Sequence, residues 1–166
     1  MPKTAFIALG SNLGDSLLNM QKAIGAMAAF SEGEIMKSSV WRSAPVGFDD
    51  DVPAFLNAVV GFQTSLTGEA LLASLKVIES DQGRGQRRTE RSESRPIDLD
   101  IIDLGGEILN LPGLTLPHPR AADRAFVLRP LAEIAPGFQF PGDERNLAQF
   151  ISVVADQEIE RTELRL

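Results

Sequence analysis

The chain has 166 residues, of which 43% are hydrophobic, and it carries a formal net charge of -7 with no cysteine. This length fits one domain with a sizeable core, and we take residues 1–166 as a single domain. The acidic balance excludes a general nucleic-acid-binding surface, and the lack of cysteine excludes disulfides and thiolate metal sites. Because no apolar run approaches the ~20 residues of a membrane span and the amino terminus lacks a signal-peptide core, we expect a cytoplasmic monomer.

The first half of the sequence predicts a strand, a helix and two further strands. Residues 4–10 are a short apolar run ended by glycine, typical of a buried strand, and residues 16–30 repeat apolar side chains at helical spacing. Residues 34–44 alternate loosely between polar and apolar side chains, which favours a second strand before the loop 45–53 with its Pro and Gly residues. Residues 54–66 are predicted to form a third strand.

The second half adds a helix, a strand and short terminal elements. Residues 67–83 have the pattern of a capped amphipathic helix, and residues 96–104 predict a fourth strand that leads into a hairpin. Short helices are expected within 124–136 and 146–157. This order predicts an α+β fold with a ferredoxin-like βαββαβ core, in which helices pack on one face of a mainly antiparallel sheet, plus a C-terminal hairpin and short helices. Such a fold hosts RNA binders, metal chaperones and enzymes alike, so the function must be argued from the site.

The fourth predicted strand carries two aspartates one residue apart, Asp98 and Asp100. Side chains two apart in a strand share a face at roughly 6.5–7 Å, so the two carboxylates lie together. Ile97, Leu99 and Ile101 then face the opposite side. A pair of carboxylates completed by substrate phosphates is a ligand set that Mg²⁺ accepts. The competing interpretation is an edge strand with an acidic solvent face.

An arginine-rich segment leads directly into that strand. The stretch from Arg84 to Arg95 contains five of the sixteen Lys and Arg residues and lacks any hydrophobic residue. Guanidinium groups bind phosphate oxygens bidentately, and phosphoryl transfer depends on positioning and charge neutralisation. A solvated charged loop is the alternative, but the position of the segment next to the aspartates favours a phosphoryl-transfer site.

Other candidate residues lie at isolated positions. His118, the only histidine, is flanked by prolines and followed by Arg124, a pattern that fits a phosphate contact as well as an ordinary surface or core position. Asn57 interrupts an apolar run, and its amide matches the donor and acceptor edge of a heterocycle, although satisfied packing would explain it too. Phe55 and Phe126 are core residues unless a flat ligand is present to stack on them.

Several motifs occur together in one order and spacing. They are "ALGSNLGD", "FLNAVV", "RPIDLDIIDL", "LPHPR" and "RAFVLRPLAEIAP". In combination, from about Thr4 to Pro141, they closely resemble the 6-hydroxymethyl-7,8-dihydropterin pyrophosphokinases of folate biosynthesis. The resemblance implies an ATP-dependent diphosphotransferase, which moves the β,γ-diphosphate of ATP to the hydroxymethyl oxygen of the pterin and releases AMP. It also implies two Mg²⁺ ions.

The resemblance assigns roles to individual residues. The catalytic residues that it implies are Arg84, Arg95, Asp98 and Asp100, of which the two aspartates bind the metal. The ATP-binding residues that it implies are Glu79, Arg84, Arg95, Ile101, Thr115, His118 and Arg124. The pterin-binding residues that it implies are Ser43, Ala44, Val46, Gly47, Phe55, Asn57 and Phe126.

The chain also departs from the family pattern. Where the family commonly reads "RWGPR", this chain reads "RSESR", so an aromatic that helps to close the catalytic loop is missing. Lys76 replaces a frequent glutamine, and Phe55 replaces a frequent tyrosine. We expect an active enzyme, and the alternative is a weakly active relative that binds pterin or nucleotide without efficient turnover. An RNA-binding module is disfavoured by the acidic balance, whereas a phosphohydrolase would share the aspartates and release ADP or phosphate.

Overall fold

The computed structural model describes residues 1–43, 54–82 and 96–166. In this part of the chain, six strands form the main sheet in the order β5-β1-β4-β3-β8, with β2 paired to β4 on the same side as β3. The pairings recorded between these strands are antiparallel. The strands are β1 (Lys3–Ser11), β2 (Glu32–Lys37), β3 (Trp41–Ser43), β4 (Phe55–Thr64), β5 (Asp98–Leu104) and β8 (Ile159–Arg161).

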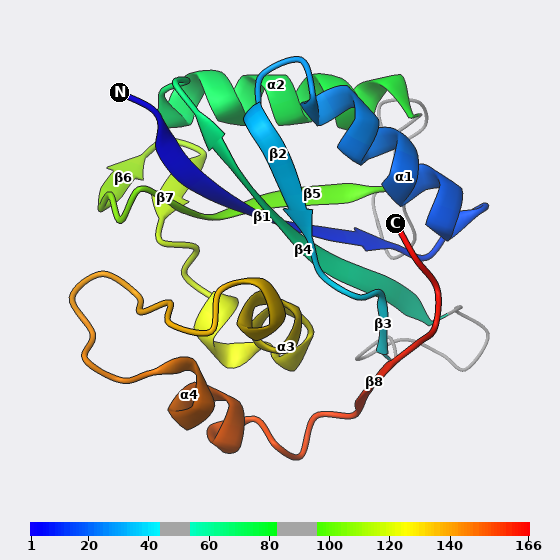
Figure 1. Ribbon diagram of the computed structural model, residues 1–166, viewed down its shortest axis with the longest axis vertical. Coiled ribbons are helices and arrows are strands. Elements are labelled where there is room, and N and C mark those ends of the chain that lie inside the picture. Colours follow the sequence, from blue (N-terminus) through cyan, green and yellow to red (C-terminus); the bar gives the residue numbers. More distant parts are fainter. Residues whose placement is uncertain (44–53, 83–95) are drawn as a thin grey trace.

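Helices cover both faces of this sheet (Figure 1). α1 (Ser16–Met27) and α2 (Gly68–Asp81) pack on one face, where they enclose Ile7, Val60 and Ile101 in one buried cluster. α3 (Ala125–Ile134) and α4 (Leu147–Val153) form a second cluster with Val59 and Ile102 on the other face. The sequence predicted helices on one face only. Successive residues of β4 alternate between the two faces, and because Val59 is apolar on the second face it needs cover from α3 and α4, so residues 57–62 are buried without interruption.

The ferredoxin-like arrangement predicted from the sequence is confirmed, with one strand divided. The predicted strand 34–44 becomes β2 and β3, because at Ser38 the side-chain hydroxyl takes the place of a ladder carbonyl. Ser38 Oγ accepts from Val59 N at 2.9 Å, while Ser38 N donates to Val59 O at 3.0 Å. The predicted hairpin forms a separate two-stranded sheet of β6 (Leu109–Leu111) and β7 (Leu114–Leu116). Within the described ranges, every helix is too short or too polar to cross a membrane.

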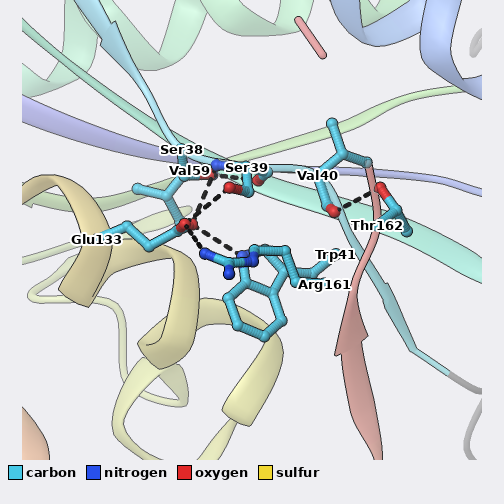
Figure 2. A network of polar contacts seen from close by, with 8 residues as sticks. All are labelled: Ser38, Ser39, Val40, Trp41, Val59, Glu133, Arg161 and Thr162. Atoms are coloured by element: carbon cyan, nitrogen blue, oxygen red, sulfur yellow. Dashed lines mark hydrogen bonds and ion pairs between the residues drawn. The ribbon is translucent and has the colours of Figure 1, made fainter. Parts of the chain in front are cut away.

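A carboxylate network centred on Glu133 ties α3 to β3 and to the C-terminal strand (Figure 2). Its Oε1 accepts from Ser39 N at 3.0 Å and from Trp41 Nε1 at 2.9 Å, and its Oε2 accepts from Ser39 Oγ at 2.7 Å and Arg161 Nη1 at 3.5 Å. Partial burial alone would raise the pKa of Glu133, but the hydrogen bonds from Trp41 and Ser39 outweigh it and lower that pKa. The network therefore fixes the strand that ends at Ser43.

Replacing Glu133 with glutamine should destabilise the fold by about 1–2 kcal/mol at neutral pH, because charged hydrogen bonds are weakened. Since the folded-state pKa of Glu133 lies below its ordinary value of 4.5, the charged carboxylate contributes its full stabilisation above that value. The contribution is lost as pH falls through the folded-state pKa. Urea unfolding of both proteins at several pH values should show a constant difference from about pH 7 down to about pH 4.5, and a difference that shrinks as the pH falls further.

Glu163→Gln is the matched control, because it removes the same charge from an exposed C-terminal position. It should change the free energy of unfolding by less than ~0.5 kcal/mol. A Glu133→Gln effect that equals the control, or that does not depend on pH, would contradict the assignment of a stabilising charged network.

Candidate active site

Two cavities meet at a shared wall that consists of Asp98, Asp100 and His118. The larger cavity has a volume of about 520 Å³ and extends over β1, β4 and the start of α3. The smaller cavity has a volume of about 340 Å³ and lies against α2 and β7. Two ligands that fill these cavities would therefore contact the same three polar side chains, so the shared wall is where a group could pass from one ligand to the other.

The pairing of β5 with β1 creates the hollow above the two aspartates. Asp98 lies opposite Gly10 and Asp100 lies opposite Ala8 in the antiparallel register. These small residues, which line the larger cavity together with the aspartates, leave room above the sheet. Leu99 is buried between the aspartates on the other face, as the strand periodicity predicted. The carboxylates are thus held by a strand whose opposite side is fixed in the core.

Two backbone groups of β5 make hydrogen bonds outside the sheet, although β5 is an edge strand. The backbone N–H of Leu99 donates to Glu79 Oε2 of α2 at 2.8 Å, and Glu79 is only 4% exposed. On the same strand, Ile102 O accepts from His118 N at 2.9 Å. An edge strand with its polar groups satisfied in this way holds its position. Glu79, predicted to contact ATP, therefore also anchors the backbone between the two aspartates.

His118 contributes a hydrogen-bond donor to the shared wall. Its Nδ1 accepts from the backbone N–H of Arg120 at 3.1 Å, which leaves Nε2 to carry the proton of a neutral imidazole. Burial lowers the pKa of His118, and Arg124 and Arg120 lower it further, while Asp100 acts in the opposite direction. At neutral pH the ring is therefore uncharged, and Nε2–H is the group it can offer to an anionic ligand.

Because His118 is the only histidine in the chain, its titration can be followed without assignment. In the metal-free protein, the imidazole proton resonances should titrate with a midpoint below the ordinary value of 6.5. Arg120→Gln should raise that midpoint, because it removes a positive charge near the ring. A midpoint at or above 6.5 in the wild-type protein would contradict the buried position described for His118.

The larger cavity combines an amide with aromatic side chains. Asn57 is 3% exposed on β4, and its Nδ2 donates to Ser43 Oγ of β3 at 2.7 Å, which fixes the orientation of the amide. Phe55 and Phe126 line the same cavity. Arg124 lies with its guanidinium carbon 5.5 Å from the centre of the Phe126 ring, within cation–π range. A flat heterocycle with a polar edge matches this combination.

The structure sorts most of the predicted residues into two groups. The smaller cavity is lined by Glu79, Ile101 and Thr115, which were predicted on the nucleotide side, and by Lys76. The larger cavity is lined by the predicted pterin residues Ser43, Phe55, Asn57 and Phe126. Arg124, predicted on the nucleotide side, lines the larger cavity as well. The predicted residues Ala44, Val46, Gly47, Arg84 and Arg95 lie outside the described residues, as does the "RSESR" segment.

Sequence reasoning did not single out Gln157, which also lines the larger cavity. It follows α4, in a polar segment where neither spacing nor composition sets it apart from its neighbours. Its position can be recognised only when the end of the chain is placed beside α3 in the folded structure.

The shared wall fits a divalent cation with oxygen ligands. Asp98 and Asp100 supply two carboxylates on one strand face, and both act electrostatically on Arg124 across the same cavity. Among the described residues, three or more His, Asp or Glu side chains do not cluster into a complete metal site. Mg²⁺ commonly takes one or two carboxylates and completes its coordination with phosphate oxygens and water. The donor set thus fits an ion that binds together with a phosphorylated substrate.

Fold and site together define a class of enzymes in which a nucleotide and a second small molecule meet at paired carboxylates. The model of the 7,8-dihydro-6-hydroxymethylpterin-pyrophosphokinase family matches residues 6–136. The chain belongs to this family. The predictions of the family, of the ferredoxin-like fold and of an ATP-dependent diphosphotransferase class are thereby confirmed.

Relatives of this chain carry the corresponding enzyme name. The chain is 38% identical to the 2-amino-4-hydroxy-6-hydroxymethyldihydropteridine pyrophosphokinase of Pseudomonas aeruginosa, over 97% of this chain and 98% of that protein. It is 39% identical to the enzyme of the same name from Bacillus subtilis, over 81% of this chain and 79% of that protein. It is also 37% identical to the folic acid synthesis protein fol1 of Pneumocystis carinii, but it spans only 21% of that longer protein.

Solved structures share the fold at low sequence identity. A crystal structure of HPPK-DHPS in complex with substrates superposes with a TM-score of 0.70 at 13% identity, covering 94% of this chain and 44% of that chain. A Plasmodium falciparum HPPK-DHPS variant with SDX-DHP gives a TM-score of 0.71 at 12% identity, covering 94% of this chain and 46% of that one. This chain therefore spans less than half of these longer proteins, and at such identities the likeness establishes the fold alone.

Proposed function

We propose that this chain transfers the β,γ-diphosphate of ATP to the hydroxymethyl oxygen of 6-hydroxymethyl-7,8-dihydropterin, releasing AMP. The observation that carries the proposal is the shared wall of Asp98, Asp100 and His118 between two cavities of different character. One cavity has an amide and aromatic side chains, and the other runs along α2 and β7. Membership of the pyrophosphokinase family supports the same reaction.

The pterin is proposed to occupy the larger cavity. Asn57 is held by Ser43 so that the free part of its amide can pair with the polar edge of the ring, and an edge that lacked such groups would leave a buried amide unsatisfied. Phe55 and Phe126 would contact the two flat faces of the ring. This arrangement would direct the hydroxymethyl group toward the aspartates.

The nucleotide is proposed to occupy the smaller cavity, with its phosphates at the shared wall. Thr115 and Ile101 line this cavity, and Lys76 adds a positive charge to it. His118 would donate Nε2–H to a phosphate oxygen, and Arg124 would bind the diphosphate from the side of the larger cavity. Arg84 and Arg95, at the ends of the arginine-rich segment, are proposed as further phosphate contacts.

In the reaction, the hydroxymethyl oxygen forms a bond to the β-phosphorus while the bond from that phosphorus to the α,β-bridging oxygen breaks. AMP leaves with that oxygen, and the hydroxyl proton passes to solvent. Mg²⁺ held by Asp98 and Asp100 supplies charge neutralisation on the phosphates when bound, and two ions are proposed. The residues of the shared wall act mainly by positioning and by electrostatics, which are the main contributions that a phosphoryl transfer requires of the protein. A monomeric state and a cytoplasmic location are proposed as well.

The direct test is incubation of the protein with MgATP and the reduced hydroxymethylpterin, followed by separation of the nucleotides. AMP and pterin diphosphate should appear in equal amounts, and AMP formation should stop when either pterin or Mg²⁺ is omitted. Formation of ADP and phosphate instead would identify a phosphohydrolase, and binding of both substrates without AMP would identify the weakly active relative.

Asp98→Asn and Asp100→Asn should each reduce turnover by at least ~100-fold, because either change removes a charged oxygen ligand from the proposed ion. The far-ultraviolet circular dichroism and the unfolding midpoint should stay close to those of the wild-type protein. Glu144→Gln is the control, since it neutralises an exposed carboxylate that lines neither cavity. Near-normal turnover in either aspartate variant would refute the metal assignment.

A further inference from the structure

We propose that Gln157 is a positioning residue that fixes the backbone on both sides of Arg124 and so sets the wall of the larger cavity. The inference rests on the proposed function, which places the pterin and the diphosphate against Arg124 and Phe126. Gln157 comes from the segment after α4, outside the region 6–136 that matches the family model. The C-terminal part of the chain would thus take part in the reaction without carrying a catalytic group.

Gln157 binds the two peptide groups that flank Arg124. Its Oε1 accepts from the backbone N–H of Ala125 at 2.8 Å, and its Nε2 donates to the carbonyl oxygen of Asp123 at 2.8 Å. Because an N–H requires an acceptor and a carbonyl requires a donor, these partners also determine the positions of Oε1 and Nε2 in the Gln157 amide. We call this pair of hydrogen bonds the Gln157 bracket. Its effect is to hold Arg124 in its extended backbone conformation at φ -124° and ψ 115°.

The bracket compensates for an unusual residue at the start of α3. Arg124 occupies the N-cap position, where Ser, Thr, Asp or Asn usually turns its side chain back onto the first free N–H groups. In the described structure the Arg124 side chain makes no such bond, and it lines the larger cavity and stacks near Phe126. A guanidinium group has no acceptor atom, so the Arg124 side chain cannot cap these N–H groups. Gln157 supplies an acceptor for one of the free N–H groups, that of Ala125, the first residue of the helix.

Gln157 is itself attached to the core through α4. Its backbone N–H donates to Val154 O at 3.0 Å, and Val154 is buried in the cluster that α3 and α4 share with the sheet. The backbone of Gln157 is therefore held in place while its side-chain amide bonds to Ala125. Gln157 also lines the larger cavity, so a shift of this side chain would change both the backbone of Arg124 and the shape of the space beside it.

The bracket predicts a specific kinetic pattern for Gln157→Met, which keeps the length of the side chain and removes both hydrogen bonds. The loss of two partly exposed hydrogen bonds should lower kcat and raise KM for the pterin by roughly three- to tenfold. KM for ATP should rise as well, because the bracket holds Arg124, which is proposed to bind the diphosphate. A general loss of stability would instead lower the active fraction and leave both KM values unchanged.

Gln149→Met is the matched control. The Gln149 side chain also makes a hydrogen bond at a helix start, where its Oε1 accepts from Asn146 N in the capping box of α4, and it lines neither cavity. It should affect the unfolding midpoint and leave the KM values of both substrates as they are. If Gln157→Met and Gln149→Met give the same kinetic pattern, Gln157 has only a structural role and the proposal is wrong.

A second measurement is independent of activity. Amide hydrogen exchange at Ala125 should be slow in the wild-type protein and clearly faster in Gln157→Met, while exchange in β1 and β4 stays the same. Unchanged exchange at Ala125 would overturn the bracket itself. A wild-type protein without pterin-dependent AMP formation would overturn the proposed function, and the exchange at Ala125 would then still decide whether the bracket exists.

Discussion

The antiparallel pairing of β5 with β1 is the constraint on which the rest of the site depends. It places Asp98 and Asp100 opposite Gly10 and Ala8, so that the charged strand face meets the two smallest side chains available. A larger residue at either position would fill the hollow in which the carboxylates lie. The register is in turn set by the other face of β5, where Leu99 belongs to the core, because a shift by one residue would exchange the buried and exposed faces.

Charges of opposite sign share the wall around this hollow. Without a ligand, the aspartates lie near Arg124, whose pKa is lowered chiefly by burial and also by Arg120. Carboxylates and guanidinium groups so close together stabilise one another, and each kind also matches a different part of a metal–phosphate complex. In a metal–phosphate complex, the metal ion can therefore bind the carboxylates and the phosphate oxygens can bind the guanidinium group, in place of the attraction between these side chains.

Much of the fold was predictable because its elements have strong local signals. The apolar run of residues 4–10 and the periodic residues 67–83 became β1 and α2 nearly unchanged. The short helices α3 and α4 were predicted as elements, but their packing on the second face of the sheet and the short strand β8 were not, since both depend on contacts between the C-terminal third and the sheet. The division into β2 and β3 was missed because the hydroxyl of Ser38 acts within the strand ladder, a role that its side-chain type alone does not indicate.

Many residues of the candidate site could also be chosen from the sequence, but for reasons other than local structural signals. Strand periodicity predicted that the two aspartates share a face, whereas roles for Asn57 and Phe126 were predicted from the family resemblance. Both of these residues line the larger cavity. Gln157 could not be inferred, because its partners are backbone groups more than thirty residues away. Backbone groups carry no sequence signature, so such contacts become visible only in the folded structure.

The central claim is that nucleotide and pterin meet at a metal held by Asp98 and Asp100. Paramagnetic relaxation with Mn²⁺ in place of Mg²⁺ tests this claim most directly, in a complex of the protein with a nonhydrolysable ATP analogue and the pterin. The account predicts strong broadening of both the phosphate resonances of the nucleotide and the proton resonances of the pterin, and its loss in Asp98→Asn and Asp100→Asn. Broadening of the nucleotide alone, or broadening that persists in the aspartate variants, would contradict it.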